Sequence, residues 1–234
     1  MRQGFIGPKR LAAVGVFALG LCLRAEAAPI LPGGAFITPP EPDPAGGILQ
    51  PGSGAPVAFS AGGPAGFSGT LTANVYKDDP SNPFAGIGDP NPLNHGLTFT
   101  YTLHSNATSI TSLERLVLTD FSGFATDVSY QAPTTGQAPS STDRSFGPGA
   151  VIGWSFTGAP AGLGRLAPGQ TSALLVVQTN APSYDLTQTA SVIDGSIALV
   201  PTIGPSLSMI SPEPSSLFLL AIPGMVALRR RRSS

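Results

Sequence analysis

Apolar residues recur at every second position in short segments of the chain between residues 66 and 200. Two segments show this most clearly: Phe67, Leu71, Ala73 and Val75 in the first, and Leu97, Phe99, Tyr101 and Leu103 in the second. Successive side chains of a β-strand point to opposite faces, so this period places one face on a core and the other in water. The threonines of the second segment, Thr98, Thr100 and Thr102, are expected on the polar face. No sustained helical period occurs in this region, which predicts a fold made of strands.

Further strands are predicted where apolar runs alternate with clusters of Gly, Pro, Asn and Asp that are typical of turns. They cover residues 113–121, 125–130, 151–156, 172–179 and 195–200. Leu174 to Val177 are apolar on both faces, which predicts a central, doubly covered strand. About seven short strands favour an all-β, antiparallel β-sandwich, with a jelly roll or another two-sheet arrangement as alternatives. Trp154 shares its face with Ile152 and Phe156, so we predict a core anchor rather than a ligand-stacking platform.

Glycine and proline are abundant, with 29 and 25 residues among 234. Their usage exceeds the average of about 7% and 5%. Much of the surplus falls in residues 28–64, which predict an irregular Pro/Gly-rich arm with one edge strand at 57–60 and no helix. The β-sandwich domain is then expected at 65–205, followed by a linker at 206–211.

Between Ala28 and Ser211 the chain is acidic, with four basic and eleven acidic residues and a formal charge of −7. Nucleic-acid binding is excluded, because it depends on neutralising phosphates with Lys and Arg. The chain has one cysteine, Cys22, which lies before this region. The region therefore has no disulfide and no thiol nucleophile, and packing alone must stabilise it.

The N-terminus has the three parts of a secretory signal peptide. They are a basic start with Arg2, Lys9 and Arg10, an apolar run from Leu11 to Leu23, and an A-x-A cleavage site at Ala25 and Ala27. We therefore predict a signal peptide at 1–27, export through the Sec machinery and cleavage by signal peptidase after Ala27. An uncleaved anchor helix is the alternative.

The C-terminus combines three elements in a fixed order. Pro212, Glu213 and Pro214 come first, an uncharged apolar run from Leu217 to Leu228 follows, and Arg229, Arg230, Arg231 and Arg232 come last. The two prolines hold the motif extended and accessible, because each fixes φ and lacks an amide donor. The arginines would keep the end of the chain on the cytoplasmic side of a membrane.

This tail, residues 212–234, resembles the PEP-CTERM sorting signal of exported proteins from Gram-negative bacteria that make extracellular polysaccharide. The resemblance implies a short C-terminal transmembrane helix and removal of the tail by the membrane transpeptidase exosortase. Two features depart from the family: Ser211 precedes the motif where Val is common, and the apolar run has 12 residues against about 20 needed to span hydrocarbon. The expected course is an inner-membrane intermediate, then the outer surface or a matrix of extracellular polysaccharide. A membrane-anchored periplasmic protein that keeps its tail is an alternative.

Residues that could carry catalysis are few, and we predict no enzymatic activity. His95 and His104 are the two neutral-pH proton carriers, and neither has the companions of a catalytic motif. Both are expected to be surface histidines. Ser155 lies in Gly-Trp-Ser-Phe-Thr, which lacks the second glycine of a nucleophile elbow.

An Asp- and Asn-rich stretch from Lys77 to Asn94 is the candidate metal site. Asp78, Asp79, Asn82 and Asp89 offer the oxygen ligands that Ca²⁺ prefers. The same residues beside Pro and Gly also make an ordinary long turn. A carbohydrate- or calcium-binding surface module therefore stays open, with Tyr76, Tyr130 and Tyr184 as candidate exposed aromatics; no other cofactor is predicted.

Overall fold

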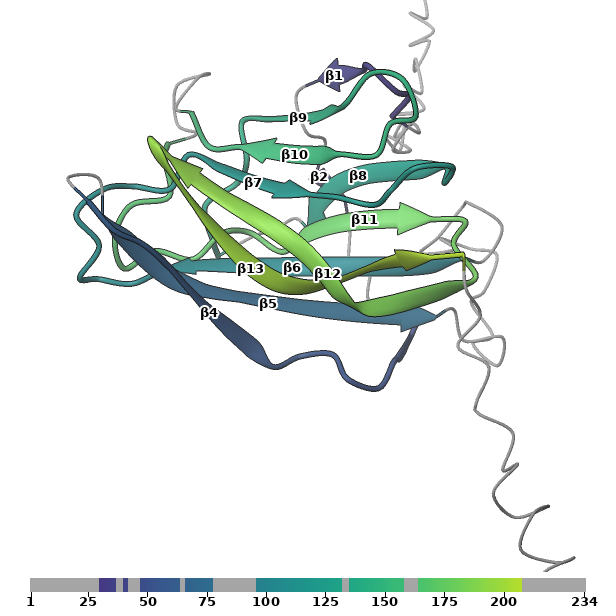
Figure 1. Ribbon diagram of the computed structural model, residues 1–234, viewed down its shortest axis with the longest axis horizontal. Coiled ribbons are helices and arrows are strands. Elements are labelled where there is room, and N and C mark those ends of the chain that lie inside the picture. The colour runs from purple at the N-terminus through teal and green to yellow at the C-terminus, as the bar shows by residue number, and fades with distance from the viewer. Residues whose placement is uncertain are drawn as a thin grey trace, which may run out of the picture.

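The computed structural model describes residues 30–36, 40–41, 47–63, 66–77, 96–131, 135–157 and 164–207. Within these ranges the chain forms strands and turns and contains no helix. The strands build two sheets that face each other across a common hydrophobic core (Figure 1). The predicted all-β class with two antiparallel sheets is therefore confirmed for this part of the chain.

The first sheet has six strands, all paired antiparallel. Their order across the sheet is β1 (Ala35–Phe36), β9 (Ser141–Arg144), β10 (Ile152–Ser155), β7 (Arg115–Leu118), β12 (Ser183–Asp194) and β13 (Ser196–Ser206).

The second sheet has a path of six strands with a seventh attached at one edge. The order is β2 (Pro40–Glu41), β8 (Thr126–Gln131), β11 (Leu175–Thr179), β6 (Leu97–Ser105), β5 (Phe67–Lys77) and β3 (Ile48–Leu49), with β4 (Pro56–Ala61) also paired to β5. Every pair is antiparallel except β2 with β8.

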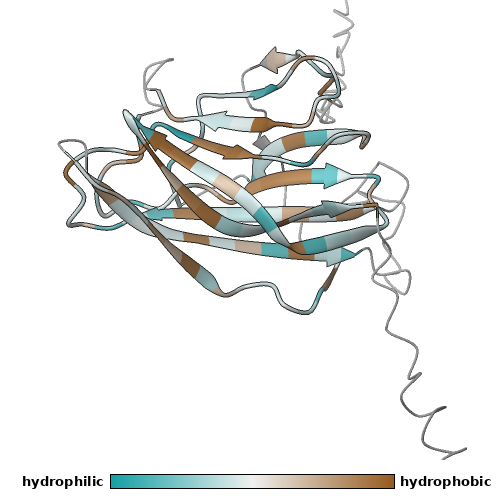
Figure 2. Ribbon diagram, in the orientation of Figure 1, coloured by the Kyte–Doolittle hydropathy of each residue, from teal (hydrophilic) through white to brown (hydrophobic). Residues whose placement is uncertain are grey.

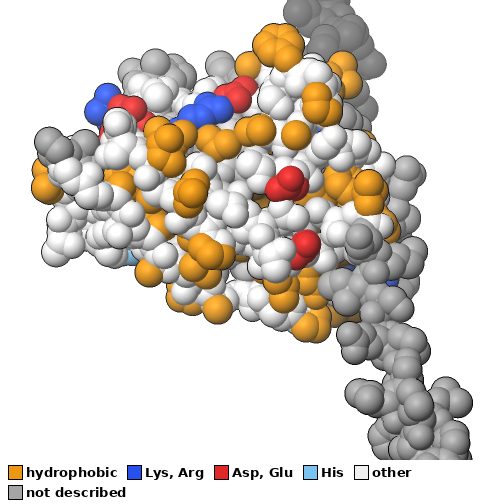
Figure 3. Space-filling view, viewed as in Figure 1, with side chains coloured by type: hydrophobic (Ala, Val, Ile, Leu, Met, Phe, Trp, Pro, Cys, Tyr) orange, Lys and Arg blue, Asp and Glu red, His pale blue; other side chains and the backbone are white. Residues whose placement is uncertain are grey.

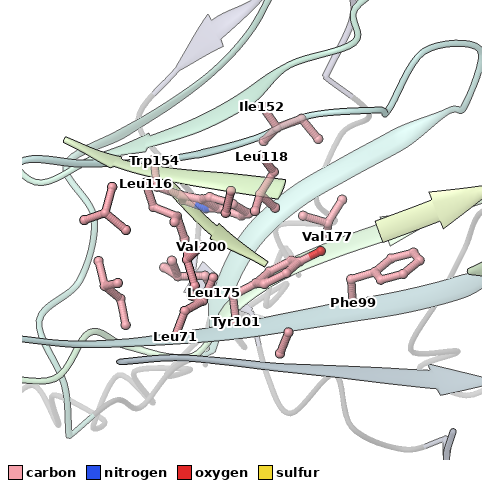
Figure 4. Close-up of a cluster of buried hydrophobic side chains, with 14 of the residues drawn as sticks. Leu71, Phe99, Tyr101, Leu116, Leu118, Ile152, Trp154, Leu175, Val177 and Val200 are labelled. Atoms are coloured by element: carbon pink, nitrogen blue, oxygen red, sulfur yellow. The ribbon is translucent and has the colours of Figure 1, made fainter. Parts of the chain in front are cut away.

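The core lies between the sheets and centres on Trp154 and Tyr101, both completely buried. Their ring centroids are 6.1 Å apart, and the Tyr101 hydroxyl donates a hydrogen bond of 2.7 Å to the carbonyl of Ile203. Figure 4 shows Trp154 and Leu116 of the first sheet facing Tyr101 of the second. The prediction that Trp154 anchors the core is confirmed.

The predicted alternation is visible in β5, where buried and half-buried residues alternate from Phe67 to Tyr76. Figure 2 shows brown apolar bands separated by paler bands along the strands. The predicted strand at 172–179 forms over 175–179 as β11, and its central place is confirmed, because β11 lies between β8 and β6 and all of its residues are buried.

The threonine row of β6 differs from expectation. Thr98 and Thr100 are buried, at 1% and 0% exposure, and Thr102 alone of the three is half-buried. Asp127, Ser129 and Gln178 on the neighbouring strands share that outer face and are also buried. The outer face of the second sheet is therefore closed to water over β6, β8 and β11.

The hairpin of β12 and β13 is the largest structural feature missed by the sequence analysis. No strand was predicted at 183–194, and the last predicted strand stopped at Val200 rather than Ser206. Residues 185–189 of β12 are mostly exposed and polar, and the register shifts between Asp185 and Gln188. That bulge interrupts the apolar alternation from which strands are recognised.

The described part of the Pro/Gly-rich arm takes part in both sheets. β1 pairs with β9, β2 with β8, and β3 and β4 with β5. Each lies at a sheet edge, where an unpaired strand would otherwise present free backbone groups. The predicted edge strand at 57–60 corresponds to β4, whereas the other three were not predicted.

Two ends of the sandwich differ in what they carry. At one, which we call the entry end, the described chain begins at Ile30 and finishes at Leu207, beside the loops 119–125 and 145–150. At the other, the cleft end, β6 finishes and β11 begins, and the loops 106–112 and 164–174 lie there. In Figure 1 the arrowheads of β5, β11 and β13 point to the entry end.

Candidate functional site

The predicted sorting, membrane and calcium residues all fall outside the described residues. This applies to Ala25 and Ala27, to Pro212, Glu213 and Pro214, to Arg229 through Arg232, and to Asp78, Asp79, Asn82 and Asp89. In the described ranges, no helix is long and apolar enough to cross a bilayer. The same ranges contain no group of three His, Cys, Asp or Glu side chains placed to hold a metal ion.

A polar cleft of about 620 Å³ opens at the cleft end. Two short segments line it: Thr135, Gly136 and Gln137 on one side, and Gly169, Gln170, Thr171 and Ser172 on the other. None of these side chains carries a charge, and none is a large apolar or aromatic group.

Backbone pairing builds the cleft. Thr171 bridges to His104 at the end of β6, and Ser172 bridges in parallel to Gln137. The hydrogen bonds Gln137 N to Thr171 O and Ala173 N to Gln137 O, at 2.9 and 2.8 Å, hold the two segments together. Gly136 makes this approach possible, because a Cβ there would lie 2.1 Å from the carbonyl oxygen of Ser172.

Several polar side-chain groups of the cleft are already paired. The Gln137 amide donates to the carbonyl of Ala138 at 3.1 Å, and the Gln170 side-chain oxygen accepts from the amide of Ala167 at 2.9 Å. The side-chain nitrogen Nε2 of Gln170 and the side-chain oxygen Oε1 of Gln137 make no protein bond among the described residues, so they offer N–H donors and an acceptor to a ligand. The cleft therefore suits a neutral ligand rich in hydroxyl groups.

His104 lies beside the cleft, with its Nδ1 2.9 Å from the Thr171 hydroxyl. A base next to a hydroxyl is the first requirement of nucleophilic catalysis, but the base must also be oriented by a third group. No described residue hydrogen-bonds the second ring nitrogen of His104. As the sequence predicted, this histidine is partly exposed at a strand end; its pairing with Thr171 was not foreseen.

Ser155 is not an exposed nucleophile. Its side chain is largely buried and accepts a hydrogen bond of 2.8 Å from Arg115, whose guanidinium binds both carboxylate oxygens of Asp143 at 2.7 and 2.6 Å. The guanidinium lies over Gly153, where a Cβ would come 2.1 Å from its nitrogen. Figure 3 shows blue and red groups adjoining along the upper edge of one face, while other red groups on that face stand apart.

Arg144 organises the entry end and was not recognised from the sequence. It is 5% exposed, and burial lowers the pKa of its guanidinium. All its hydrogen bonds go to main-chain carbonyls: Gly149 at 2.8 Å, Ile30 at 3.0 Å, Phe121 at 3.0 Å and Phe124 at 2.8 Å. Backbone acceptors leave no mark in a sequence, so no motif could have identified this residue.

The candidate tyrosines do not form an open stacking surface. Tyr130 and Tyr184 pack against the hydrophobic core, and the Tyr184 hydroxyl donates to the carbonyl of Pro51 at 2.9 Å. Tyr76 lies opposite Thr98 and is half-buried.

Comparison of the chain with protein-family models, with curated proteins and with solved structures finds no match.

Proposed function

We propose that this chain is an exported structural protein of the cell surface or extracellular matrix, released through a PEP-CTERM-type sorting tail. One observation carries the proposal: Pro212-Glu213-Pro214, an apolar run and four arginines follow one another at the C-terminus. The signal-peptide pattern at the N-terminus supports export independently. In this proposal the strand-built body, whose core is held by packing, is the cargo.

In this proposal the two chain ends are the parts that interact with the membrane and its proteases. Leu217 to Leu228 dock in the bilayer, and Arg229 to Arg232 fix their orientation. Exosortase then cuts within the tail beside Pro212-Glu213-Pro214, and the body joins a polysaccharide matrix.

Intact-mass spectrometry of the protein from membranes and from surface material tests the sorting step. Surface material is expected to start at Ala28 and to lack Arg229 to Arg232. Replacing Glu213 with Ala should leave the full tail in the membrane fraction, whereas replacing Ser215 with Ala serves as a matched control. Surface protein that retains the arginines would instead favour the membrane-anchored alternative.

A second candidate function is recognition of a neutral glycan, favoured by the uncharged polar cleft. Isothermal titration of the purified protein with neutral and acidic bacterial polysaccharides would test it. Gln170→Ala should weaken binding of a neutral chain about tenfold, which is the loss of roughly one good hydrogen bond. Thr187→Ala, far from the cleft, should leave binding unchanged. Equal titration curves for both variants and the parent would eliminate the cleft as a site.

Calcium binding by the stretch from Lys77 to Asn94 stays a prediction. Titration with millimolar Ca²⁺ should raise the melting temperature if Asp78, Asp79, Asn82 and Asp89 hold the ion, and Asp79→Asn with Asp89→Asn should remove that shift. An unchanged melting temperature would leave the loop as a long turn.

A further inference from the structure

The first and last described residues, Ile30 and Leu207, both lie at the entry end of the sandwich. The amide of Ile30 donates to the carbonyl of Thr126 at 2.9 Å, and Thr126 pairs with Thr179, the last residue of β11. Ser206 at the end of β13 pairs with Ser183 at the start of β12. Because β11 and β13 both finish there, the segments that lead to the two apolar runs leave from the entry end.

Both connecting segments are short. Six residues, 24–29, separate Leu23 from Ile30, and nine, 208–216, separate Leu207 from Leu217. Counted between the residues that they join, the segments contain seven and ten Cα steps and reach at most about 25 and 35 Å at ~3.5 Å per step. The ten steps of β13 span about 33 Å at ~3.3 Å each. The N-terminal segment is therefore too short to pass the length of the body and bring the cleft end to a membrane that holds both apolar runs.

The entry end exposes apolar side chains where a bilayer would meet it. Phe146, Leu31 and Leu207 are 85%, 74% and 74% exposed. The Phe146 ring lies directly against Gly33, where a Cβ would come 2.6 Å from it. Arg144 fixes the segments that carry Phe146 and Leu31 through its bonds to Gly149 and Ile30.

Few charged groups among the described residues lie at this end. The exposed or half-exposed ionisable side chains there are Lys77, Asp120 and Asp185, whose sum is a single negative charge. The sequence between Lys77 and Gly96 adds Asp78, Asp79 and Asp89, so a neutral lipid surface favours the contact more than an anionic one.

We propose that the entry end rests on the bilayer surface while the chain is held by its apolar termini, with Phe146, Leu31 and Leu207 in the headgroup region and the cleft end facing away. The inference rests on the proposed function and concerns the stage before signal peptidase and exosortase cut the chain, when both apolar runs are in the membrane. It adds the face of the body that touches lipid and the residues that make the contact.

The test uses the full chain with Cys22→Ser, reconstituted in vesicles, and one cysteine at a time labelled with an environment-sensitive fluorophore. Ser122→Cys reports on the entry end, since Arg144 ties its loop to residue 149. Ile110→Cys lies at the cleft end and Leu199→Cys on the outer face of the first sheet, and both positions are exposed. Lipids with a nitroxide near the headgroup should quench the Ser122 probe severalfold more than the other two.

A matched variant isolates the apolar contact. Phe146→Ser with Leu31→Ser should reduce quenching at Ser122 to the level of Ile110, while the protein still floats with the vesicles through its termini. Fluorescence of Trp154 checks that the core is intact.

Three results would overturn the proposal. Equal quenching at all sites would mean that the body does not rest on the bilayer, and stronger quenching at Leu199 would mean that it lies on its side. Failure of the full chain to float with vesicles would remove the proposed membrane function as well, so the two failures are distinguishable.

Discussion

Different interactions stabilise the loops at the two ends of the sandwich. At the entry end, one buried cation bonds four carbonyls from three separate segments. At the cleft end, main-chain bridges join residues 135–137 to 171–173, and a glycine allows the close approach. The arrangement of the loops at the entry end therefore depends on the Arg144 side chain. At the cleft end it depends on Gly136, which has no side chain to separate the two segments.

Replacing Arg144 should have the largest effect. Arg144→Ala removes the side-chain donor of four carbonyls, of which that of Phe121 keeps a bond from the Phe124 amide, and should lower the free energy of unfolding by about 3 to 4 kcal/mol. Urea unfolding followed by Trp154 fluorescence measures this, and hydrogen exchange should show faster opening at 119–125 and 145–150 than at 169–173.

Arg165→Ala is the matched control. Its ion pair with Glu114 is short, 2.6 Å, but the Arg165 side chain is 59% exposed. The loss should stay within about 0.5 kcal/mol, as for other surface pairs. Equal losses for the two arginines would contradict the distinction between the ends.

Adding a methyl group at Gly136, at the cleft end, should have the next largest effect on stability. Gly136→Ala sets a Cβ against the Ser172 carbonyl and should cost about 2 kcal/mol through overpacking. Gly62→Ala, where a Cβ meets nothing within 4 Å, should change stability by less than about 0.5 kcal/mol. Thermal unfolding of both variants compares them.

Gly153→Ala sharpens the same comparison, since its Cβ would also come 2.1 Å from another atom. Here the obstacle is the flexible end of Arg115, which can move at the cost of a half-exposed ion pair. A penalty as large as that of Gly136→Ala would show that proximity alone, not the rigidity of the neighbour, decides the cost.

Tyr101, in the core between the two ends, should show a smaller effect that depends on pH. Tyr101→Phe removes the hydrogen bond to Ile203 and should cost about 1 kcal/mol near neutral pH. Burial raises the pKa of the phenol above its ordinary range, so the folded state keeps a proton that the unfolded chain loses above about pH 10. Stability of the parent should therefore fall as pH rises from 9 to 11, and fall less in the variant.

The smallest effect is expected at Asp185, near the entry end. Hydrogen bonds from the hydroxyl and amide of Thr187, both 2.8 Å, lower the pKa of this carboxyl. Any stability from this contact is present above the ordinary Asp pKa and lost as pH falls through the lowered value. Thr187→Val should raise the pKa toward its ordinary range, measured by NMR titration, while Thr187→Ser should retain the lowered value.

How well strands could be predicted depended on their local pattern. β5 and β6 were identified because their apolar faces alternate strictly, and β11 because it is apolar on both faces. β12 was missed because its bulge replaces alternation with polar residues, although ten residues of β13 pair with it. Long-range pairing stabilises such a strand regardless of its local pattern.

The candidate site was less predictable. His104 was recognised as a histidine at a strand end. Its partner Thr171 is distant in sequence and meets it through an isolated bridge, and Gln137 joins the same segment through a second bridge, to Ser172. Arg144 had no predictable role, because its four partners are carbonyls that every residue possesses.

The sequence by itself determined the strand-built class, the acidic middle and the apolar runs near both termini, since each follows from composition or local periodicity. Only the tertiary structure decided that Ile30 and Leu207 lie at one end, that Thr98 and Thr100 are buried, and that a single guanidinium joins three segments. These features depend on which distant residues become neighbours, and that is fixed by sheet pairing and packing of the whole body rather than by any local stretch.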